Sequence, residues 1–316
     1  MKFGNWEDWS CKEIMKKLGE ENFVYKMSAD NKPVLTVKPG ELVVISARDG
    51  FGGSIKSDDD PFPVIDLEHV NQTTGPIYVE GAEPGDTLVV HVKKIALPPQ
   101  GVTTIFPGFG VLKDDFNLQW KKICPIRSGK VTFPKGIKIP TRPVIGTVGV
   151  SPASGAVGNL FPGPHGGNLD IHDITTGSTI YLPVFVPGAL FSLGDGKAVM
   201  GDGEVNGVGI EVGMKVTVKL DLVKRQKIER PRLETTNHAM TIASAKTVEE
   251  ASRLALGDMV NYLTSTTSLS REEAYALLGA VADVKIANLV DPEVTVRVAV
   301  PKYVFNQAKR KQGTRP

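Results

Sequence analysis

The chain has 316 residues, which is enough to bury a large core in one big β-rich domain or in two ordinary domains. Hydrophobic residues make up 41% and charged residues 23%, and this balance excludes a mainly disordered chain and a membrane protein. The formal net charge of +2 lacks the basic excess of a dedicated nucleic-acid-binding protein. The 33 glycines and 22 prolines predict many tight turns, which join short strands more often than long helices.

Residues 1–21 are predicted to form a short N-terminal helical extension, because their apolar residues share one helical face. These residues are Trp6, Trp9, Ile14, Met15 and Leu18. The segment has no apolar stretch followed by a cleavage site, and no run of about 18 apolar residues occurs in the chain. We therefore expect a cytoplasmic protein with no membrane partner.

Residues 22–302 are predicted to form one domain, with a β body over 22–246. Its main strand candidates are 34–38, 42–47, 76–79, 87–92, 144–150, 178–186, 207–212 and 214–223, separated by Gly, Pro, Asn and Asp. Most gaps are too short for the crossover helix that parallel strands need. The sequence thus predicts a mainly β fold of antiparallel sheets stacked as a β-sandwich or jelly roll. The polar residues 224–246 are expected to form an exposed connection or an edge strand.

Two helices are predicted near the C-terminus, over residues 247–282. Each begins with a capping-box pattern, Thr247 with Glu250 and Ser270 with Glu273, followed by apolar residues at helical spacing. A closing strand is expected over 293–301, where valines alternate. Residues 303–316 are expected to be a flexible basic tail.

The chemically informative segment runs from residue 162 to residue 204 and is rich in Gly. It holds two histidines and five acids: His165, Asp170, His172, Asp173, Asp195, Asp202 and Glu204. Carboxylates that pack together repel each other unless a cation lies between them. Imidazole with carboxylates suits Zn²⁺, whereas an all-oxygen group suits Ca²⁺ or Mg²⁺.

Plainer interpretations stay open at several of these positions. Gly-Asp-Gly is a common turn in which the aspartate caps the backbone, and His172 suits a hydrogen-bonding role as well as ligation. Asp49, which follows an apolar strand and precedes glycines, faces either a cleft or a turn. Cys124 has no nearby histidine, so a thiol nucleophile is not expected.

Three stretches, residues 74–86, 164–204 and 270–292, resemble the acetamidase/formamidase family, and the similarity spans about residues 23–302. The resemblance implies a mainly β fold, hydrolysis of formamide or acetamide to the acid and ammonia, a bound metal, and a homodimer or higher homo-oligomer. The family's HGGNxD element falls on His165, Gly166, Gly167, Asn168 and Asp170. Its GDG element falls on Asp195, its GDGE element on Asp202 and Glu204, and its early D-x-F-G element on Asp49.

The resulting hypothesis is metal-assisted amide hydrolysis. A divalent ion, most simply Zn²⁺ with or without Ca²⁺, would be held by residues from the set His165, Asp170, Asp195, Asp202 and Glu204, and would polarise the carbonyl and activate water. Glu204 or Asp49 would carry the proton, and Gly166, Gly167 and Asn168 would contact the substrate. Two alternatives remain: a non-catalytic β-sandwich binding module with a structural Ca²⁺ site, and an amidohydrolase for another amide, such as a cyclic one.

Overall fold

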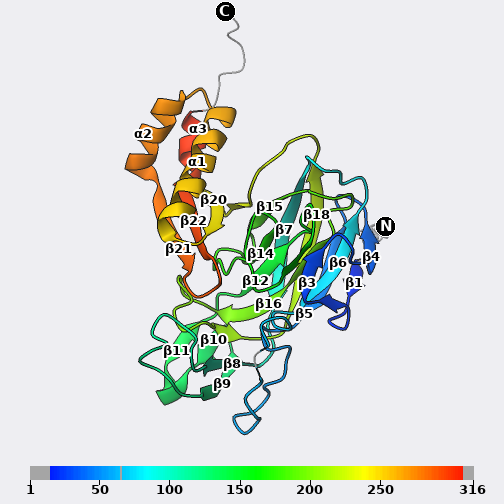
Figure 1. Cartoon of the computed structure of the whole chain (residues 1–316), viewed down its shortest axis with the longest axis vertical. Coiled ribbons are helices and arrows are strands. Elements are labelled where there is room, and N and C mark those ends of the chain that lie inside the picture. The colour runs from blue at the N-terminus through cyan, green and yellow to red at the C-terminus, as the bar shows by residue number, and fades with distance from the viewer. Residues whose placement is uncertain (1–14, 65, 309–316) are drawn as a thin grey trace, which may run out of the picture.

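Two large sheets form the body of the protein, which the computed structural model describes over residues 15–64 and 66–308 (Figure 1). The first sheet has nine strands in the order β1 (Lys16–Leu18), β5 (Leu42–Ala47), β18 (Met214–Val223), β7 (Thr87–Ala96), β15 (Thr179–Pro183), β19 (Arg232–Glu234), β20 (His238–Ala245), β22 (Val294–Pro301) and β21 (Asp283–Asn288). Most of its pairings are antiparallel, as the short connections predict.

The second sheet has eleven strands. Eight follow the order β11 (Lys138–Pro140), β10 (Lys130–Thr132), β9 (Trp120–Arg127), β8 (Gln100–Ile105), β17 (Ile210–Glu211), β16 (Phe191–Val199), β12 (Val144–Gly149) and β14 (Gly166–Asn168). Strand β6 (Thr73–Val79) pairs with β16 and carries β2 (Phe23–Val24) and β4 (Leu35–Val37). A small separate sheet joins β3 (Lys26–Ser28) to β13 (Ala156–Gly158).

The main core lies between the two large sheets. In β5, Val43 and Ile45 are buried and alternate with half-buried residues, which is the pattern of a strand with one face on a core. They belong to the same apolar cluster as Ile145 of β12 and Phe191 of β16. Burying one such side chain stabilises the fold by about 1.5–3 kcal/mol. The predicted mainly β, sandwich-like fold is confirmed.

Three helices lie together at one end of the molecule: α1 (Val248–Thr266), α2 (Arg271–Val281) and α3 (Lys302–Gln307) (Figure 1). The predicted pair is confirmed, and α2 begins with the complete capping box of Ser270 and Glu273. At α1 the Thr247 side chain accepts a hydrogen bond from the Glu250 backbone. The helices pack on β20 and β22 through a second apolar cluster that includes Met259 of α1. Among the described residues, no helix has the length and apolar character that crossing a bilayer requires.

Three expectations about secondary structure were wrong. Lys16–Leu18 is a strand paired in parallel with Val43–Ile45, not part of a helix, because an open edge of the sheet is available to it; residues 1–14 of the expected extension lie outside the described residues. Strand β20 is an interior strand, buried between β19 and β22, rather than an exposed connection. Residues 303–307 of the expected flexible tail belong to the helix Lys302–Gln307.

Candidate active site

Strand β16 supplies the centre of the site, since Asp195 and Lys197 are two residues apart and lie on one face of it. The Lys197 side chain is only 3% exposed, and its Nζ lies 2.6 Å from Asp195 Oδ2 and 2.7 Å from Asp170 Oδ1. Glu204 Oε1 is 3.2 Å from the same nitrogen. Three of the five acids of the 162–204 segment therefore meet, and they meet around a lysine ammonium group.

The three acids that contact Lys197 share an unusual backbone conformation. Asp170, Asp195 and Glu204 have φ angles of 45°, 55° and 43°, in the left-handed region that residues other than glycine seldom adopt. Such strained residues persist only where the surrounding structure holds them, and they gather at functional sites. Three neighbouring cases around one buried cation mark this cluster as a candidate active site.

Burial controls the proton affinities of the cluster. Burial disfavours the charged ammonium of Lys197, but the neighbouring carboxylates outweigh it and hold the pKa of Lys197 well above its usual value. Burial, together with the charge of Asp170, raises the pKa of Glu204 well above its usual range. Burial also raises the pKa of Glu211, the register partner of Lys197 on β17. The neighbouring carboxylates thus favour the protonated form of Lys197, and burial favours the protonated form of both glutamates.

A small cavity opens beside the cluster and has a volume of about 60 Å³. Since one water molecule needs roughly 10–15 Å³ of such space, the cavity admits a molecule of only a few heavy atoms. Its polar wall contains Asn71, Asn168, Asp195, Lys197, Glu204, Glu211 and Asp291. Its apolar wall contains Phe51, Leu67, Val70, Phe106, Phe109, Leu160 and Val208. A short polar molecule with a small apolar end fits this wall.

Asn168 lines the cavity, and its side chain makes hydrogen bonds with three neighbouring residues. Its Nδ2 donates to Asp291 Oδ2 at 2.9 Å, and its Oδ1 accepts from Asn71 Nδ2 at 3.0 Å and from the Thr147 hydroxyl. Burial raises the pKa of Asp291 well above its usual value. The predicted substrate contact Asn168 thus lines the cavity, where it also orients Asp291.

Gly166 and Gly167 have a packing role in β14. A Cβ atom at Gly166 would lie 2.2 Å from the Val148 carbonyl oxygen, and one at Gly167 would lie 2.2 Å from that of Phe161. Both glycines let backbone approach backbone, and neither lines the cavity. Their predicted contact with substrate has no support in this geometry.

The predicted metal cage is not formed by the residues that were expected to build it. Across residues 15–64 and 66–308, no three His, Cys, Asp or Glu side chains form a group that could hold a metal ion. Lys197 Nζ already lies where Asp170, Asp195 and Glu204 converge, so a positive charge of the chain itself balances these carboxylates. With Lys197 among them, these carboxylates do not present the donor set that was predicted to hold the ion.

Asp49 lies next to the site but outside the cavity wall. It is buried, and its Oδ1 accepts hydrogen bonds from the backbone N–H groups of Phe51 and Gly53 at 3.0 and 2.8 Å. Burial raises the pKa of Asp49, and the charge of Asp195 adds to the effect. Its geometry is that of the turn aspartate which the sequence left open, rather than that of a proton carrier facing substrate.

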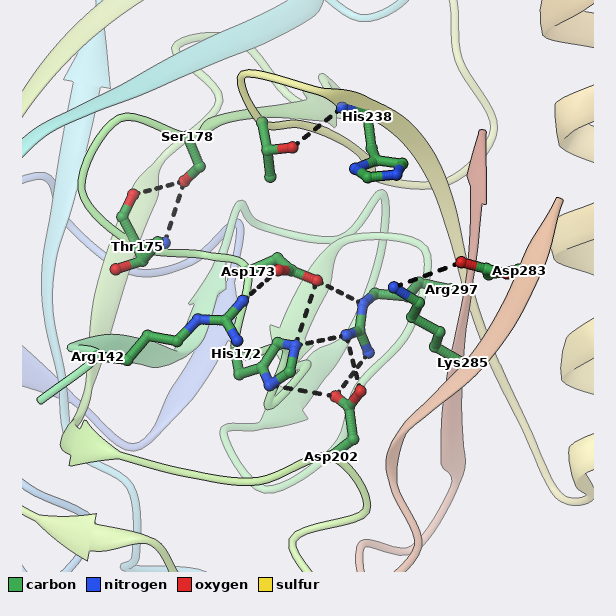
Figure 2. A network of polar contacts seen from close by, with 11 residues as sticks. Arg142, His172, Asp173, Thr175, Ser178, Asp202, His238, Asp283, Lys285 and Arg297 are labelled. Carbon is green, nitrogen blue, oxygen red and sulfur yellow. Dashed lines mark hydrogen bonds and ion pairs between the residues drawn. The ribbon is translucent and has the colours of Figure 1, made fainter. Parts of the chain in front are cut away.

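Asp202 does not line the cavity and belongs to a polar network with Arg297, His172, Asp173 and Arg142 (Figure 2). Arg297 Nη1 and Nη2 donate to the two carboxylate oxygens of Asp202 at 2.8 and 3.0 Å. Asp202 was predicted to join Glu204, but residues two apart share a face only in an extended chain, and here they lie in a turn.

His165 is buried with no acid in contact, and its Nε2 has no hydrogen-bond partner among the described residues. Burial alone lowers its pKa from 6.5 to about 4. The unfolded chain therefore binds a proton below about pH 6.5, whereas the folded chain resists protonation until about pH 4. The stability that neutral His165 contributes is therefore complete above about pH 6.5, and it is lost as the pH falls from there towards about 4.

Replacing His165 with glutamine is expected to remove this pH dependence. Between pH 6.5 and 4 the wild type should lose about 3 kcal/mol more unfolding free energy than H165Q, at about 1.4 kcal/mol per pH unit. Urea unfolding at a series of pH values measures the difference. H69Q, at an exposed histidine, is the control. Parallel pH curves for the wild type and H165Q would contradict the prediction.

Several site residues were not predicted: Asn71, Lys197, Glu211 and Asp291. Lys197 had a signal, since it follows Asp195 by two residues and would share its face in a strand. Gly146 was also missed. A Cβ atom there would lie 2.2 Å from Asp195 Oδ2, 2.6 Å from Lys197 Nζ and 2.7 Å from Asp170 Oδ1, so the cluster needs a glycine opposite it.

Replacing Gly146 with alanine is expected to push the Lys197 cluster apart. The overpacked site should cost about 1–3 kcal/mol of unfolding free energy and lower catalysis by about 100-fold, because catalytic groups are misplaced. Thermal unfolding and turnover measure the two effects. G257A is the matched control: it lies in α1 with no atom within 4 Å of the new Cβ and should stabilise by about 0.5–1 kcal/mol. Equal turnover in G146A and the wild type would contradict the expectation.

Fold and site together define a mainly β protein with a buried acid–lysine cluster beside a small cavity. The model of the acetamidase/formamidase family matches residues 15–160 and 156–307, and the chain belongs to this family.

Individual relatives are consistent with this membership. The acetamidase of Mycolicibacterium smegmatis is 33% identical over 60% of this chain and 63% of its own length, and the formamidase of Methylophilus methylotrophus is 28% identical over 86% of each chain. The crystal structure of an acetamidase from Bacillus halodurans superposes with a TM-score of 0.89 at 39% identity, covering 92% of this chain and 99% of that one. The chain spans under two thirds of the length of the Mycolicibacterium acetamidase.

Proposed function

We propose that the protein hydrolyses short aliphatic amides, formamide or acetamide, to the carboxylic acid and ammonia. The observation that carries the proposal is the 60 Å³ cavity whose wall combines Lys197 with the carboxyl groups of Glu204 and Glu211. Family membership and the names of the related acetamidase and formamidase support the same substrate class. Cys124, the free cysteine among the described residues, is buried outside this cavity and does not serve as the nucleophile, and the proposed nucleophile is water.

In the proposed reaction, Glu204 moves the proton. Its carboxylate takes a proton from water as the oxygen adds to the amide carbon, and then delivers that proton to the nitrogen as the C–N bond breaks and ammonia leaves. Lys197 Nζ, 3.2 Å from Glu204 Oε1, fixes the carboxylate and stabilises its charged form. The carboxyl group of Glu211, whose pKa is raised by burial, is the proposed hydrogen-bond donor for the developing negative charge on the carbonyl oxygen.

The apolar wall sets the expected substrate length. Three phenylalanines, Phe51, Phe106 and Phe109, line the cavity, and Phe51 and Phe106 are in ring contact with centroids 5.6 Å apart. Formamide and acetamide fit, whereas longer acyl chains meet these rings. Since each methylene in a pocket is worth about 1–3 kcal/mol, discrimination of about 10- to 200-fold per added carbon is expected.

The test is ammonia release by the purified full chain from formamide, acetamide, propionamide and butyramide at matched concentrations. Turnover of the first two, falling with acyl length, supports the proposal. Absence of release from all four, with and without added Zn²⁺ or Ca²⁺, would overturn it and favour the non-catalytic binding module. A large thermal shift on adding Ca²⁺ alone is the positive sign of that alternative.

Metal dependence remains a prediction that this assay can check separately. Loss of ammonia release after dialysis against a chelator, with recovery on adding Zn²⁺, would support it. The expected cytoplasmic location and a homodimer or larger assembly are likewise proposals. Analytical ultracentrifugation of the purified chain measures the assembly.

A further inference from the structure

Arg297 of β22 is a charged side chain with no exposed surface, buried in the network of Figure 2. Its Nε donates to Asp173 Oδ2 at 2.8 Å, and its Nη1 and Nη2 donate to both oxygens of Asp202. Nη2 also lies 2.8 Å from His172 Nε2, which must accept because a guanidinium can only donate. The Arg297 side chain thus contacts two separate loops, one that carries Asp173 and one that carries Asp202.

Each of these loops carries an acid of the Lys197 cluster. Asp173 follows Asp170 by three residues, and Asp202 precedes Glu204 by two residues. The cluster and the arginine network are therefore joined by two short pieces of backbone. A displacement of either loop at Arg297 would move a carboxylate that contacts Lys197.

Backbone hydrogen bonds also attach the loop of Glu204 to β21, the strand that pairs with β22. The Gly203 N–H donates to the Ala287 carbonyl at 2.9 Å, and the Leu289 N–H donates to the Gly203 carbonyl at 3.1 Å. Ala287 belongs to β21, which pairs with the β22 strand that bears Arg297. Side chain and backbone contacts thus attach the loop to one hairpin, and this attachment opposes the strain of Glu204 at φ 43°.

The geometry of the arginine is specific to its task. A guanidinium offers five N–H donors in a rigid fork, and here they are aimed at two carboxylates and one imidazole. A lysine carries its three N–H donors on a single nitrogen and cannot reproduce this planar fork. The charges are also balanced, because Arg142 forms a second ion pair with Asp173.

We propose that Arg297 is a positioning residue for catalysis, which acts through Asp202 to hold Glu204 against Lys197 and through Asp173 to hold Asp170 there. The inference rests on the proposed amide hydrolysis. It assigns no contact with substrate to Arg297, and it gives Asp202 a role in orientation rather than in metal binding.

The primary test uses D202N in the full chain, because Asp202 is partly exposed and the variant keeps the shape of the side chain. We expect kcat for acetamide or formamide to fall by about 10- to 100-fold, the cost of a small misplacement, with KM within about twofold of wild type. Hydrogen exchange should become faster at the amides of Gly203 and Leu289. D283N, at an exposed aspartate of the same hairpin, should match wild type in all three measurements. R297K is a second variant, expected to show the same pattern more strongly.

The outcomes separate this inference from the function on which it rests. A kcat of D202N within twofold of wild type, or a raised KM with unchanged kcat, would overturn the positioning role. If the wild type releases no ammonia from any amide, the proposed function fails. Exchange at Gly203 and Leu289 then still decides whether Asp202 fixes the loop, and equal exchange in D202N and wild type would overturn that link as well.

Discussion

Replacement of Glu204 by glutamine is expected to lower ammonia release by about 100- to 10,000-fold, the range that a positioned proton carrier contributes. Glutamine keeps the size of the side chain and can still meet Lys197, but it cannot accept and return a proton. The fold should persist, because the variant removes one of several buried carboxyl groups rather than the lysine that they share. Initial rates on formamide and acetamide, with circular dichroism to verify folding, measure the effect.

The pH dependence of the wild type provides an independent check of the same residue. A general base must be ionised, so kcat/KM should rise with pH through the pKa of Glu204. Burial raises that pKa, and the rise should therefore occur above the roughly 4.3 of an unperturbed glutamate. E249Q, at an exposed glutamate in the first turn of α1, is the matched control and should retain full activity. Activity of E204Q within tenfold of wild type would remove Glu204 from the proposed mechanism.

Replacement of Lys197 by methionine is expected to be the most destabilising single change in the site. It leaves Asp170, Asp195 and Glu204 buried without their shared cation, and breaking a buried ion pair in this way costs about 3–5 kcal/mol. The pKa of Lys197 is raised in the folded chain, so its contribution is complete below the unfolded-chain pKa of roughly 10.4 and is lost only as the pH rises through the folded value. The destabilisation should thus be fully present at pH 7.

Urea unfolding of K197M at neutral pH measures this loss. K227M removes a largely exposed lysine, and its surface ion pair with Glu229 is worth about 0–1 kcal/mol at most. If the folded fraction of K197M suffices for assay, its turnover should be lost as well, because Glu204 no longer has its partner. A loss of stability no larger than that of K227M would show that the carboxyl groups adjust by binding protons instead.

The sequence predicted the fold class and both long helices, but it did not predict β16, which bears the centre of the site. The Gly-Asp-Gly pattern in this strand is also a common turn pattern, and it was interpreted as one. In the structure these glycines allow neighbouring backbone to approach the strand closely. A Cβ atom at Gly194 would lie 2.2 Å from the Gln72 carbonyl oxygen, and one at Gly196 would lie 2.4 Å from that of Val212. Close approach of neighbouring backbone is a tertiary demand, and single-sequence patterns do not distinguish it from a turn.

The candidate site was predicted in part. The clustering of Asp170, Asp195 and Glu204 was predicted, because several carboxylates in one Gly-rich segment imply a shared cation. The identity of that cation was not, since a metal was expected where the chain supplies Lys197. Asp291 could not be found by local reasoning, because it reaches the cavity from the turn between β21 and β22.

The hairpin of β21 and β22 has a consequence for the order in which the protein matures. It carries Asp291 at the cavity and Arg297 behind it, and both are synthesised long after Lys197. Pairing of residues so distant in sequence forms late, after the entropy of closing a long loop has been overcome. On the ribosome, Lys197 and the acids that contact it are therefore synthesised before the residues that complete the cavity wall and hold those acids in position. Enzymatic competence should appear abruptly, only when the last strands join the sheet.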